Sequence, residues 1–148
     1  MLRSLGMRTG TYPTAQADWK KAGLIDCIVE SYSDVFNAIG KIALDKSLGE
    51  EEKNTKLSEL RDGRITMYFR FLEKTLERTN TAFIAGNEVT IADICISALV
   101  YTYLINEMNP MTATLKPDLE QFPRFNAYLG NLQKELAAVY AGRAPAPF

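Results

Sequence analysis

Apolar residues recur every three or four positions along most of the chain, and no segment alternates apolar and polar residues as a half-buried strand does. The longest apolar stripe runs between about residues 15 and 45, and polar or acidic side chains occupy its opposite face. Similar stripes run from about residue 50 to Arg78 and onward from Pro123. Residues 2–8 indicate a short helix that ends near Gly10. The pattern predicts an all-α bundle of about five to six helices.

One predicted helix, from about Thr90 to Asn106, is apolar almost all round, so we expect it in the centre of the bundle. Thr90 stands at its N-cap position and Asp93 three residues later, which is the spacing of a capping box. Val89 and Ile94 have the spacing of a hydrophobic staple. We therefore predict that Thr90 and Asp93 start the helix and take no part in catalysis.

The composition is that of an ordinary globular domain, with 148 residues, 47% of them apolar and 24% charged. A net charge of −1 without a basic block gives no sign of nucleic-acid binding. The longest apolar run, residues 94–105, is shorter than the about 20 residues of a membrane span. Without histidine, the chain cannot use Ser-His catalysis or a histidine metal site. We expect Cys27 and Cys95 to be buried, reduced thiols of a cytoplasmic protein, with a disulfide or a metal pair as the alternative.

Four segments carry a recognisable pattern, in this order: LRSLGMRTGTYP at residues 2–13, GLIDCIVESYSDVF at 23–36, FIAGNEVTIADI at 83–94 and QFPRFNAYLGNL at 121–132. They resemble the third helix with the interdomain linker, the fourth helix, the capped buried helix and the seventh helix of cytosolic glutathione transferases. The pattern is nearest the alpha, mu, pi and sigma-like classes. It implies a remnant of the third helix and linker at residues 1–13, a C-terminal-type helical domain at 14–142 and a mobile tail at 143–148.

Members of that family also have a thioredoxin-like N-terminal domain, which holds glutathione and supplies the Tyr, Ser or Cys that stabilises its thiolate. This chain has no βαβ segment of that kind. Met1 stands at the isoleucine position that follows the family's Gln/Glu-Ser pair for the γ-glutamyl carboxylate. The resemblance therefore implies that the catalytic half lies upstream of Met1. We expect no catalytic residue and little activity in this chain alone, with glutathione as a substrate and no metal.

The resemblance also assigns binding residues. Asp34 matches the fourth-helix aspartate that, in several classes, reaches across the dimer to the γ-glutamyl amine; alternatively, it is one of several carboxylates on a solvated face. Arg3 matches an interface arginine. The co-substrate wall would contain five residues that follow Asp34: Phe36, Ile39, Gly40, Ala43 and Leu44. For the apolar members, a place in the core or at the dimer seam is the alternative, and Leu44 replaces an aromatic residue of the family.

Three functions stay open at this point. The first is a glutathione transferase, represented by a helical domain that forms a homodimer or assembles with a separate thioredoxin-like domain. The second is a stand-alone interaction module like those of translation elongation factor complexes and tRNA synthetases. The third is a non-catalytic structural relative. The match at Asp34 and the complete linker at residues 2–13 favour the first. We also expect an exposed apolar patch, and therefore dimerisation or aggregation of the isolated chain.

Overall fold

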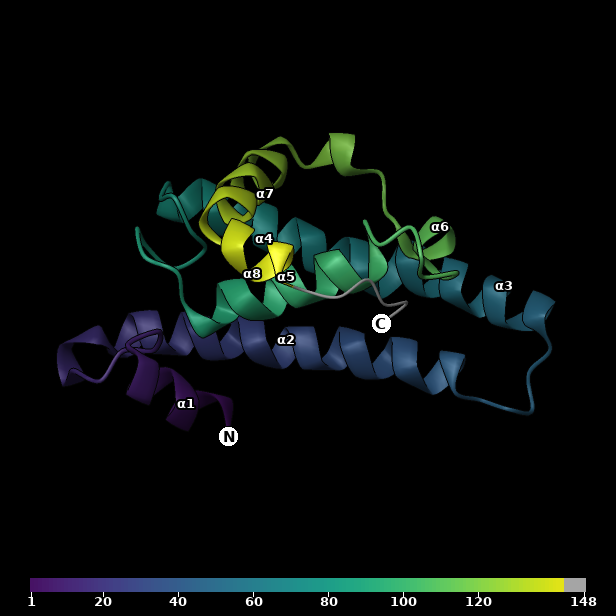
Figure 1. The fold of residues 1–148 in the computed structure, drawn as a ribbon, viewed down its shortest axis with the longest axis horizontal. Helices are drawn as coiled ribbons and strands as arrows, with labels where there is room; N and C mark the ends of the chain where they lie inside the picture. Colours follow the sequence, from purple (N-terminus) through teal and green to yellow (C-terminus); the bar gives the residue numbers. More distant parts are fainter. Residues whose placement is uncertain (143–148) are drawn as a thin grey trace.

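A computed structural model describes residues 1–142, which form helices joined by turns and loops (Figure 1). The expected all-α fold is confirmed, since the β-type pairing within this range is an isolated bridge between Phe83 and Gly86. The longer helices are α1 (Leu2–Thr9), α2 (Trp19–Ala43), α3 (Glu50–Leu60), α4 (Thr66–Thr79), α5 (Ile91–Tyr103) and α7 (Pro123–Glu135). The expected mobile tail, residues 143–148, lies outside the described residues.

The longest helix, α2, follows the longest apolar stripe of the sequence. Its buried residues recur at helical spacing and face the rest of the bundle: Ile25, Ile28, Val35 and Ile39. After α2 the chain turns at Asp45, whose carboxylate accepts hydrogen bonds from the N–H and the hydroxyl of Ser47 at 2.9 and 2.6 Å. These hydrogen bonds to the charged form lower the pKa of Asp45.

The second long helical run joins α3 to α4 through a π-helical turn, η2 (Arg61–Ile65), which the sequence pattern did not predict. A π turn interrupts the regular hydrogen-bond ladder of an α-helix. Thr66 compensates by donating its hydroxyl to the Arg61 carbonyl at 2.8 Å. The Arg61 guanidinium donates to the Thr114 carbonyl at 3.1 Å, so this turn also holds the short helix α6 (Thr112–Leu115) in place.

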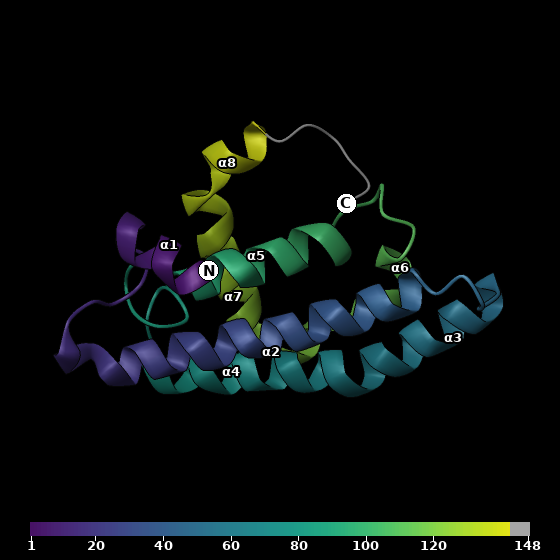
Figure 2. The same cartoon turned by 90° about the horizontal axis from the view of Figure 1, so that it is seen from below.

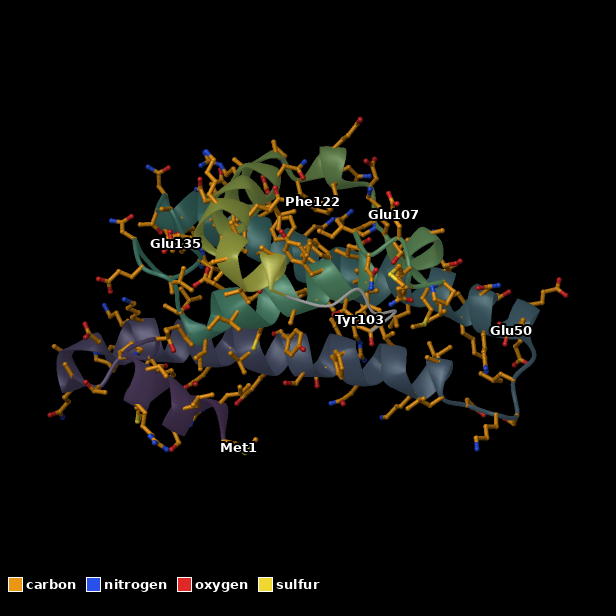
Figure 3. All side chains as sticks on the ribbon, viewed as in Figure 1. Met1, Glu50, Tyr103, Glu107, Phe122 and Glu135 are labelled. Atoms are coloured by element: carbon orange, nitrogen blue, oxygen red, sulfur yellow. The ribbon has the colours of Figure 1, made fainter. Side chains whose placement is uncertain are left out.

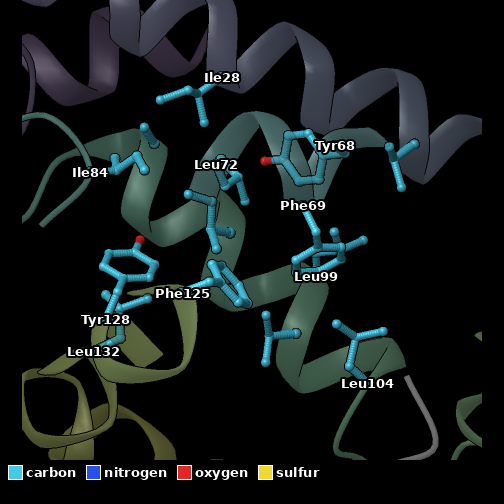
Figure 4. Packing of buried hydrophobic residues seen from close by; sticks show 14 of the residues in the cluster. Ile28, Tyr68, Phe69, Leu72, Ile84, Leu99, Leu104, Phe125, Tyr128 and Leu132 are labelled. Carbon is cyan, nitrogen blue, oxygen red and sulfur yellow. The ribbon is translucent and has the colours of Figure 1, made fainter. Parts of the chain in front are cut away.

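Helix α5 lies in the centre of the bundle, as expected of a helix that is apolar almost all round. It packs along α2, while α7 packs on α4 (Figures 1 and 2). Between α4 and α7 the fully buried rings of Phe69 and Phe125 meet edge to face, with centroids 4.8 Å apart. Leu99 of α5 belongs to the same buried cluster (Figure 4). The two long helical runs and α7 therefore share one core.

The segment between α5 and α7 contains the short helix α6 and a 3₁₀ turn, η3 (Leu119–Gln121). Buried Asn109 anchors its first part. The Asn109 amide donates to the Thr102 carbonyl at 2.8 Å, and its side-chain oxygen accepts the Met111 N–H at 2.9 Å. A last short helix, α8 (Ala137–Ala141), follows α7 directly.

The first turn of α7 is capped by a side chain from another helix. The two carboxylate oxygens of Glu73, on α4, accept the backbone N–H groups of Arg124 and Phe125 at 3.1 and 2.8 Å. These donors have no partner within α7, and a negative charge suits the positive end of a helix. Glu73 therefore fixes where α7 begins on α4.

Helix α1 lies beside α5 (Figure 2) and ends at Gly10, whose left-handed conformation (φ 75°) suits glycine. A Cβ atom at Gly6 would lie only 2.7 Å from Tyr12 Cβ and 2.8 Å from Ile91 Cγ2. A glycine at this position therefore lets α1 approach the linker and the start of α5. A 3₁₀ segment, η1 (Gln16–Asp18), then leads into α2.

Candidate functional site

The carboxylate of Asp93 is completely buried where α5, the loop before it and α7 meet. Its Oδ1 accepts the Ile84 N–H at 3.0 Å and the Tyr128 hydroxyl at 2.8 Å. Its Oδ2 accepts the Thr90 N–H at 2.8 Å, which is the Asp93 half of a capping box, and also the Thr90 hydroxyl at 2.6 Å. Four donors thus occupy the two oxygens, and all of them belong to the scaffold.

Tyr128 is a member of this network that the sequence did not reveal. Burial, together with the nearby Asp93 charge, raises the pKa of Tyr128 well above that of an exposed tyrosine. The phenol therefore stays protonated and can keep donating to the carboxylate. Tyr128 lies three residues after the buried Phe125 and therefore on the same face of α7, but nothing in the sequence pattern named Asp93 as its partner.

Asp34 is placed very differently, on the exposed edge of α2 that faces α4. It lines a shallow pocket of about 320 Å³ together with Ser31 and Val35 of α2, and the α4 side of this pocket is formed by Arg64, Met67, Tyr68 and Phe71. Within residues 1–142, neither Asp34 nor Arg64 makes an ion pair. We call this feature the α2–α4 groove.

Arg3, expected at an interface, pairs within the chain. Its Nε lies 2.6 Å from Asp26 Oδ1, and its Nη2 lies 3.8 Å from Glu30 Oε1. The second oxygen of Asp26 accepts the Tyr12 hydroxyl at 2.9 Å. The carboxylates of Asp26 and Glu30 on α2 therefore hold Arg3 of α1, and Asp26 also holds Tyr12 of the linker. The Asp26 hydrogen bond and charge raise the pKa of Arg3, which is fully charged in any case.

The five expected co-substrate residues do not form one surface. Ile39 is completely buried and belongs to the core, which was the alternative for the apolar members. Phe36 and Leu44 are exposed, by 41% and 80%, while Gly40 and Ala43 are half-buried. A Cβ atom at Gly40 would meet no other atom within 4 Å. The spacing of the other four places them along one side of α2, with Phe36 nearest the centre of the bundle.

Phe36 is part of an aromatic cluster that the sequence pattern does not reveal. Its ring lies 5.7 Å from that of Tyr32, and 6.0 Å from that of Tyr103 in an edge-to-face contact. Tyr32 comes from α2 and Tyr103 from the end of α5, next to α2 (Figure 3). Tyr32 lies within the apolar stripe between about residues 15 and 45, but the local spacing of residues does not show a contact between two helices. We call these three residues the aromatic cluster.

Both cysteines are free thiols, but only one of the two is buried as expected. Cys95 on α5 is buried, and burial raises its pKa from 9.0 to about 11, whereas Cys27 on α2 is exposed. No group of three or more potential metal ligands occurs within residues 1–142. Across the same residues, no helix is both long and apolar enough to cross a membrane.

Comparison with known proteins identifies the fold and the family. Residues 33–135 match the model of the glutathione S-transferase C-terminal domain. The chain belongs to the glutathione S-transferase family. The matched residues include Asp34, Phe36 and Tyr103, and they extend to the end of α7.

Similar individual proteins agree with this assignment. The chain is 27% identical to glutathione S-transferase alpha I of Oryctolagus cuniculus over 103 residues, covering 70% of the chain and 44% of that protein. It is 27% identical to glutathione S-transferase A3 of Homo sapiens over 118 residues, covering 76% and 51%. It thus spans about half the length of these relatives. The solved structure of NaGST-2 shares the fold, with a TM-score of 0.68 and 19% identity, over 99% of this chain and 68% of that one.

Proposed function

We propose that this chain is the helical half of a glutathione transferase, which conjugates glutathione to electrophiles. One observation carries the proposal. Asp34 is exposed and unpaired beside the α2–α4 groove, while Phe36 is exposed two residues later. Two residues along a helix correspond to about 200°, so these side chains leave α2 on different sides. In our proposal one side of α2 serves the subunit contact and glutathione, and the other side serves the co-substrate.

The proposed partner at the α2–α4 groove is a second copy of the chain. The groove combines the exposed Met67 with the half-buried Phe71, and it carries opposite charges at Asp34 and Arg64. A two-fold contact is self-complementary, so Asp34 of one copy would approach Arg64 of the other. An apolar centre with charged residues around it is typical of such interfaces.

Sedimentation equilibrium tests this contact. We expect a dimer at tens of micromolar, and a monomer for Met67→Glu, because a carboxylate would be buried in the contact without a partner. Met108→Glu is the matched control, since Met108 is similarly exposed (55%, against 68% for Met67) but lies outside the groove. A monomeric unchanged chain, or two variants that behave alike, would contradict the proposed dimer.

We further propose that the chain does not conjugate glutathione by itself. A free thiol has a pKa near 8.5, so the reaction at neutral pH requires a group that stabilises the thiolate. The chain has no histidine, and four of its seven tyrosines are buried: Tyr12, Tyr68, Tyr103 and Tyr128. In this proposal a thioredoxin-like domain supplies that group. The free thiols Cys27 and Cys95 support a cytoplasmic location, where disulfides are rare.

The assay measures conjugation of glutathione to 1-chloro-2,4-dinitrobenzene. The chain alone should match the rate in buffer, and joining the thioredoxin-like domain of an alpha-class transferase to its N-terminus should produce catalysis. Catalysis by the chain alone would contradict the proposal that a thioredoxin-like domain supplies the group that stabilises the thiolate. If the joined protein folds but neither reacts nor gains thermal stability from millimolar glutathione, the transferase proposal fails.

A joined protein that folds but neither reacts nor binds glutathione would favour the other two candidates, an interaction module or a non-catalytic structural relative. The outer face of α1 exposes Leu2 and Leu5 by 42% and 55%, and in this reading a protein other than a thioredoxin-like domain covers it. An apolar helix face of this kind suits a protein partner.

A further inference from the structure

Another pocket, separate from the α2–α4 groove, lies where the linker between α1 and α2 meets the loop before α5 (Figures 1 and 2). Its volume is about 280 Å³. Three of its lining residues are charged, and they come from different segments: Asp18 from η1, Lys21 from the first turn of α2 and Glu88 from the loop before α5. We call this feature the linker pocket.

The walls of the linker pocket are held in place by hydrogen bonds within the scaffold. The carbonyl of Thr11 accepts the Ile91 N–H at 3.0 Å, and the Thr11 N–H donates to the Gly6 carbonyl at 2.9 Å. Thr90, which also lines the pocket, donates its N–H and its hydroxyl to the buried Asp93. The pocket therefore exists before a ligand enters it, and a ligand need not order its walls.

The charged groups of the linker pocket have no partners within residues 1–142. Lys21 is half-buried, and the end of its side chain lies against the loop, since Nζ would be 3.7 Å from a Cβ atom at Gly86. Its ammonium makes neither an ion pair nor a hydrogen bond in this part of the chain, and the exposed Asp18 and Glu88 make no ion pair either. A charge that is partly removed from water without a partner costs free energy. The pocket therefore presents one unpaired ammonium and two unpaired carboxylates to a molecule that enters it.

We propose that the linker pocket binds a free basic amino acid, such as lysine. A molecule of this class carries one carboxylate and two ammonium groups, which complements the one ammonium and two carboxylates of the pocket. The carboxylate of the ligand pairs with Lys21, and its two ammonium groups pair with Asp18 and Glu88. Met7 and Val89 also line the pocket and provide apolar surface for the methylene chain of the ligand. This site goes beyond the proposed transferase function and shares no residue with the surfaces assigned to it.

Titration of the ¹⁵N-labelled chain with L-lysine and three analogues, at low ionic strength, tests the inference. Each analogue lacks one charged group of lysine: 1,5-diaminopentane lacks the carboxylate, 6-aminohexanoic acid lacks the α-ammonium, and L-norleucine lacks the ε-ammonium. We expect lysine to shift the backbone signals of Thr14, Gly86 and Glu88. It should bind roughly threefold to fivefold more tightly than each analogue, because each lost group removes one partly exposed ion pair.

Variants of the lysine side chain locate the contact with the ligand carboxylate. In Lys21→Gln, the affinity ratio of lysine to 1,5-diaminopentane should fall to about one, whereas Lys21→Arg should keep most of the preference because it retains the charge. Lys20→Gln is the matched control and should bind like the unchanged chain. Lys20 is the neighbouring residue, but its ammonium lies 5.5 Å from the centroid of the Trp19 ring and does not line the pocket.

The double variant Asp18→Asn/Glu88→Gln tests the contacts with the two ammonium groups of the ligand. It should remove the preference for lysine over both L-norleucine and 6-aminohexanoic acid. Glu107→Gln is the control, since Glu107 is equally an exposed carboxylate without an ion pair within residues 1–142 but lies outside the pocket. It should leave these preferences unchanged.

Three results would overturn the inference: no chemical-shift change at tens of millimolar lysine, equal affinity for lysine and its analogues, or the same affinities in Lys21→Gln as in Lys20→Gln. These outcomes are separate from a failure of the proposed function. A joined protein that does not conjugate glutathione would leave the affinity for lysine unchanged, whereas an active transferase that does not bind lysine would remove only the role of the linker pocket.

Discussion

Asp93 and Asp34 both lie in segments that resemble the same family, yet the fold uses their carboxylates in opposite ways. Asp93 is completely buried, and four donors from three parts of the chain surround it. Asp34 is exposed beside the α2–α4 groove and makes no ion pair within residues 1–142. One carboxylate is fully engaged by the scaffold, and the other is available to a molecule that binds from outside.

The two aspartates show how a residue that stabilises the fold differs from a residue that is available for binding. A buried charge is tolerated only where hydrogen bonds replace its water, so its removal should change stability. An exposed, unpaired charge contributes little to folding, so its removal should leave stability almost unchanged. The same contrast separates buried Cys95 from exposed Cys27, and Tyr128 from Tyr32.

The largest expected effect is that of Asp93→Ala. It leaves the Ile84 N–H, the Thr90 N–H and the Tyr128 hydroxyl without their acceptor. Each buried unpaired donor costs about 1–3 kcal/mol, and a total near 3–5 kcal/mol is expected after relaxation. Urea unfolding measures this loss in the free energy of unfolding.

Asp34→Ala is the matched control, and it should change the free energy of unfolding by no more than about 0.5 kcal/mol. The contrast between the two aspartates would break down if both variants lost similar stability. It would also break down if Asp93→Ala unfolded at the same urea concentration as the unchanged chain.

Alkaline pH should reveal the buried thiol. The pKa of Cys95 rises from 9.0 to about 11 in the folded chain, so folding favours the protonated form. This stabilisation is complete below pH 9, where the unfolded thiol is also protonated, and it is lost as pH rises from 9 to 11. The loss amounts to about 2–3 kcal/mol.

Urea unfolding at several pH values between 7 and 11 tests this. Tyrosines also release protons in the unfolded chain near pH 10, so the comparison must use the pH dependence of variants. Cys95→Ala should show a shallower fall than the unchanged chain, and Cys27→Ala should show the same fall. Parallel curves for all three proteins would refute the contribution of Cys95.

Much of the fold could be predicted because local patterns specify it. Helical spacing marked the buried face of α2, and the Thr90–Asp93 spacing marked the start of α5. The π turn at Arg61–Ile65 could not be predicted, since its stabilising contacts come from Thr66 and from the distant Thr114 carbonyl. A pattern of apolar residues describes which side of a helix is buried, but it does not describe contacts between elements.

The site was less predictable for the same reason. Asp34 and Phe36 were named through resemblance, and both are exposed. Ile39 lies three residues after Phe36, which is also helical spacing, but its side chain is completely buried in the core. Tyr103 was missed, since it joins Phe36 from a helix that lies about 60 residues further along the chain, by general packing rather than by motif.

Tyr128→Phe should have a smaller effect than the loss of Asp93 itself. It removes one donor from the carboxylate, at 2.8 Å, and retains the ring in the core. A hydrogen bond to a charged group contributes about 1.5–3 kcal/mol, and three donors remain, so we expect a loss near 1.5–2 kcal/mol. Urea unfolding measures it, with Tyr32→Phe as the control that should stay within about 0.5 kcal/mol. Equal losses would mean that the Tyr32 hydroxyl has a scaffold role.

The smallest effect on stability, and the most specific effect on function, is expected for Asp34→Asn. Folding should be unaffected, because no residue within 1–142 pairs with this carboxylate. In the chain joined to a thioredoxin-like domain, the affinity for glutathione should fall roughly fivefold to tenfold, as expected for the loss of a charge-assisted hydrogen bond to an ammonium group. Calorimetry would measure this affinity.

The proposed contact between Asp34 and glutathione spans two subunits. Met67→Glu should therefore weaken glutathione binding to a similar degree by separating the subunits, although Asp34 is unchanged. If Asp34→Asn binds glutathione normally while Met67→Glu dissociates the dimer, the groove is a subunit contact only, and Asp34 belongs to a solvated face.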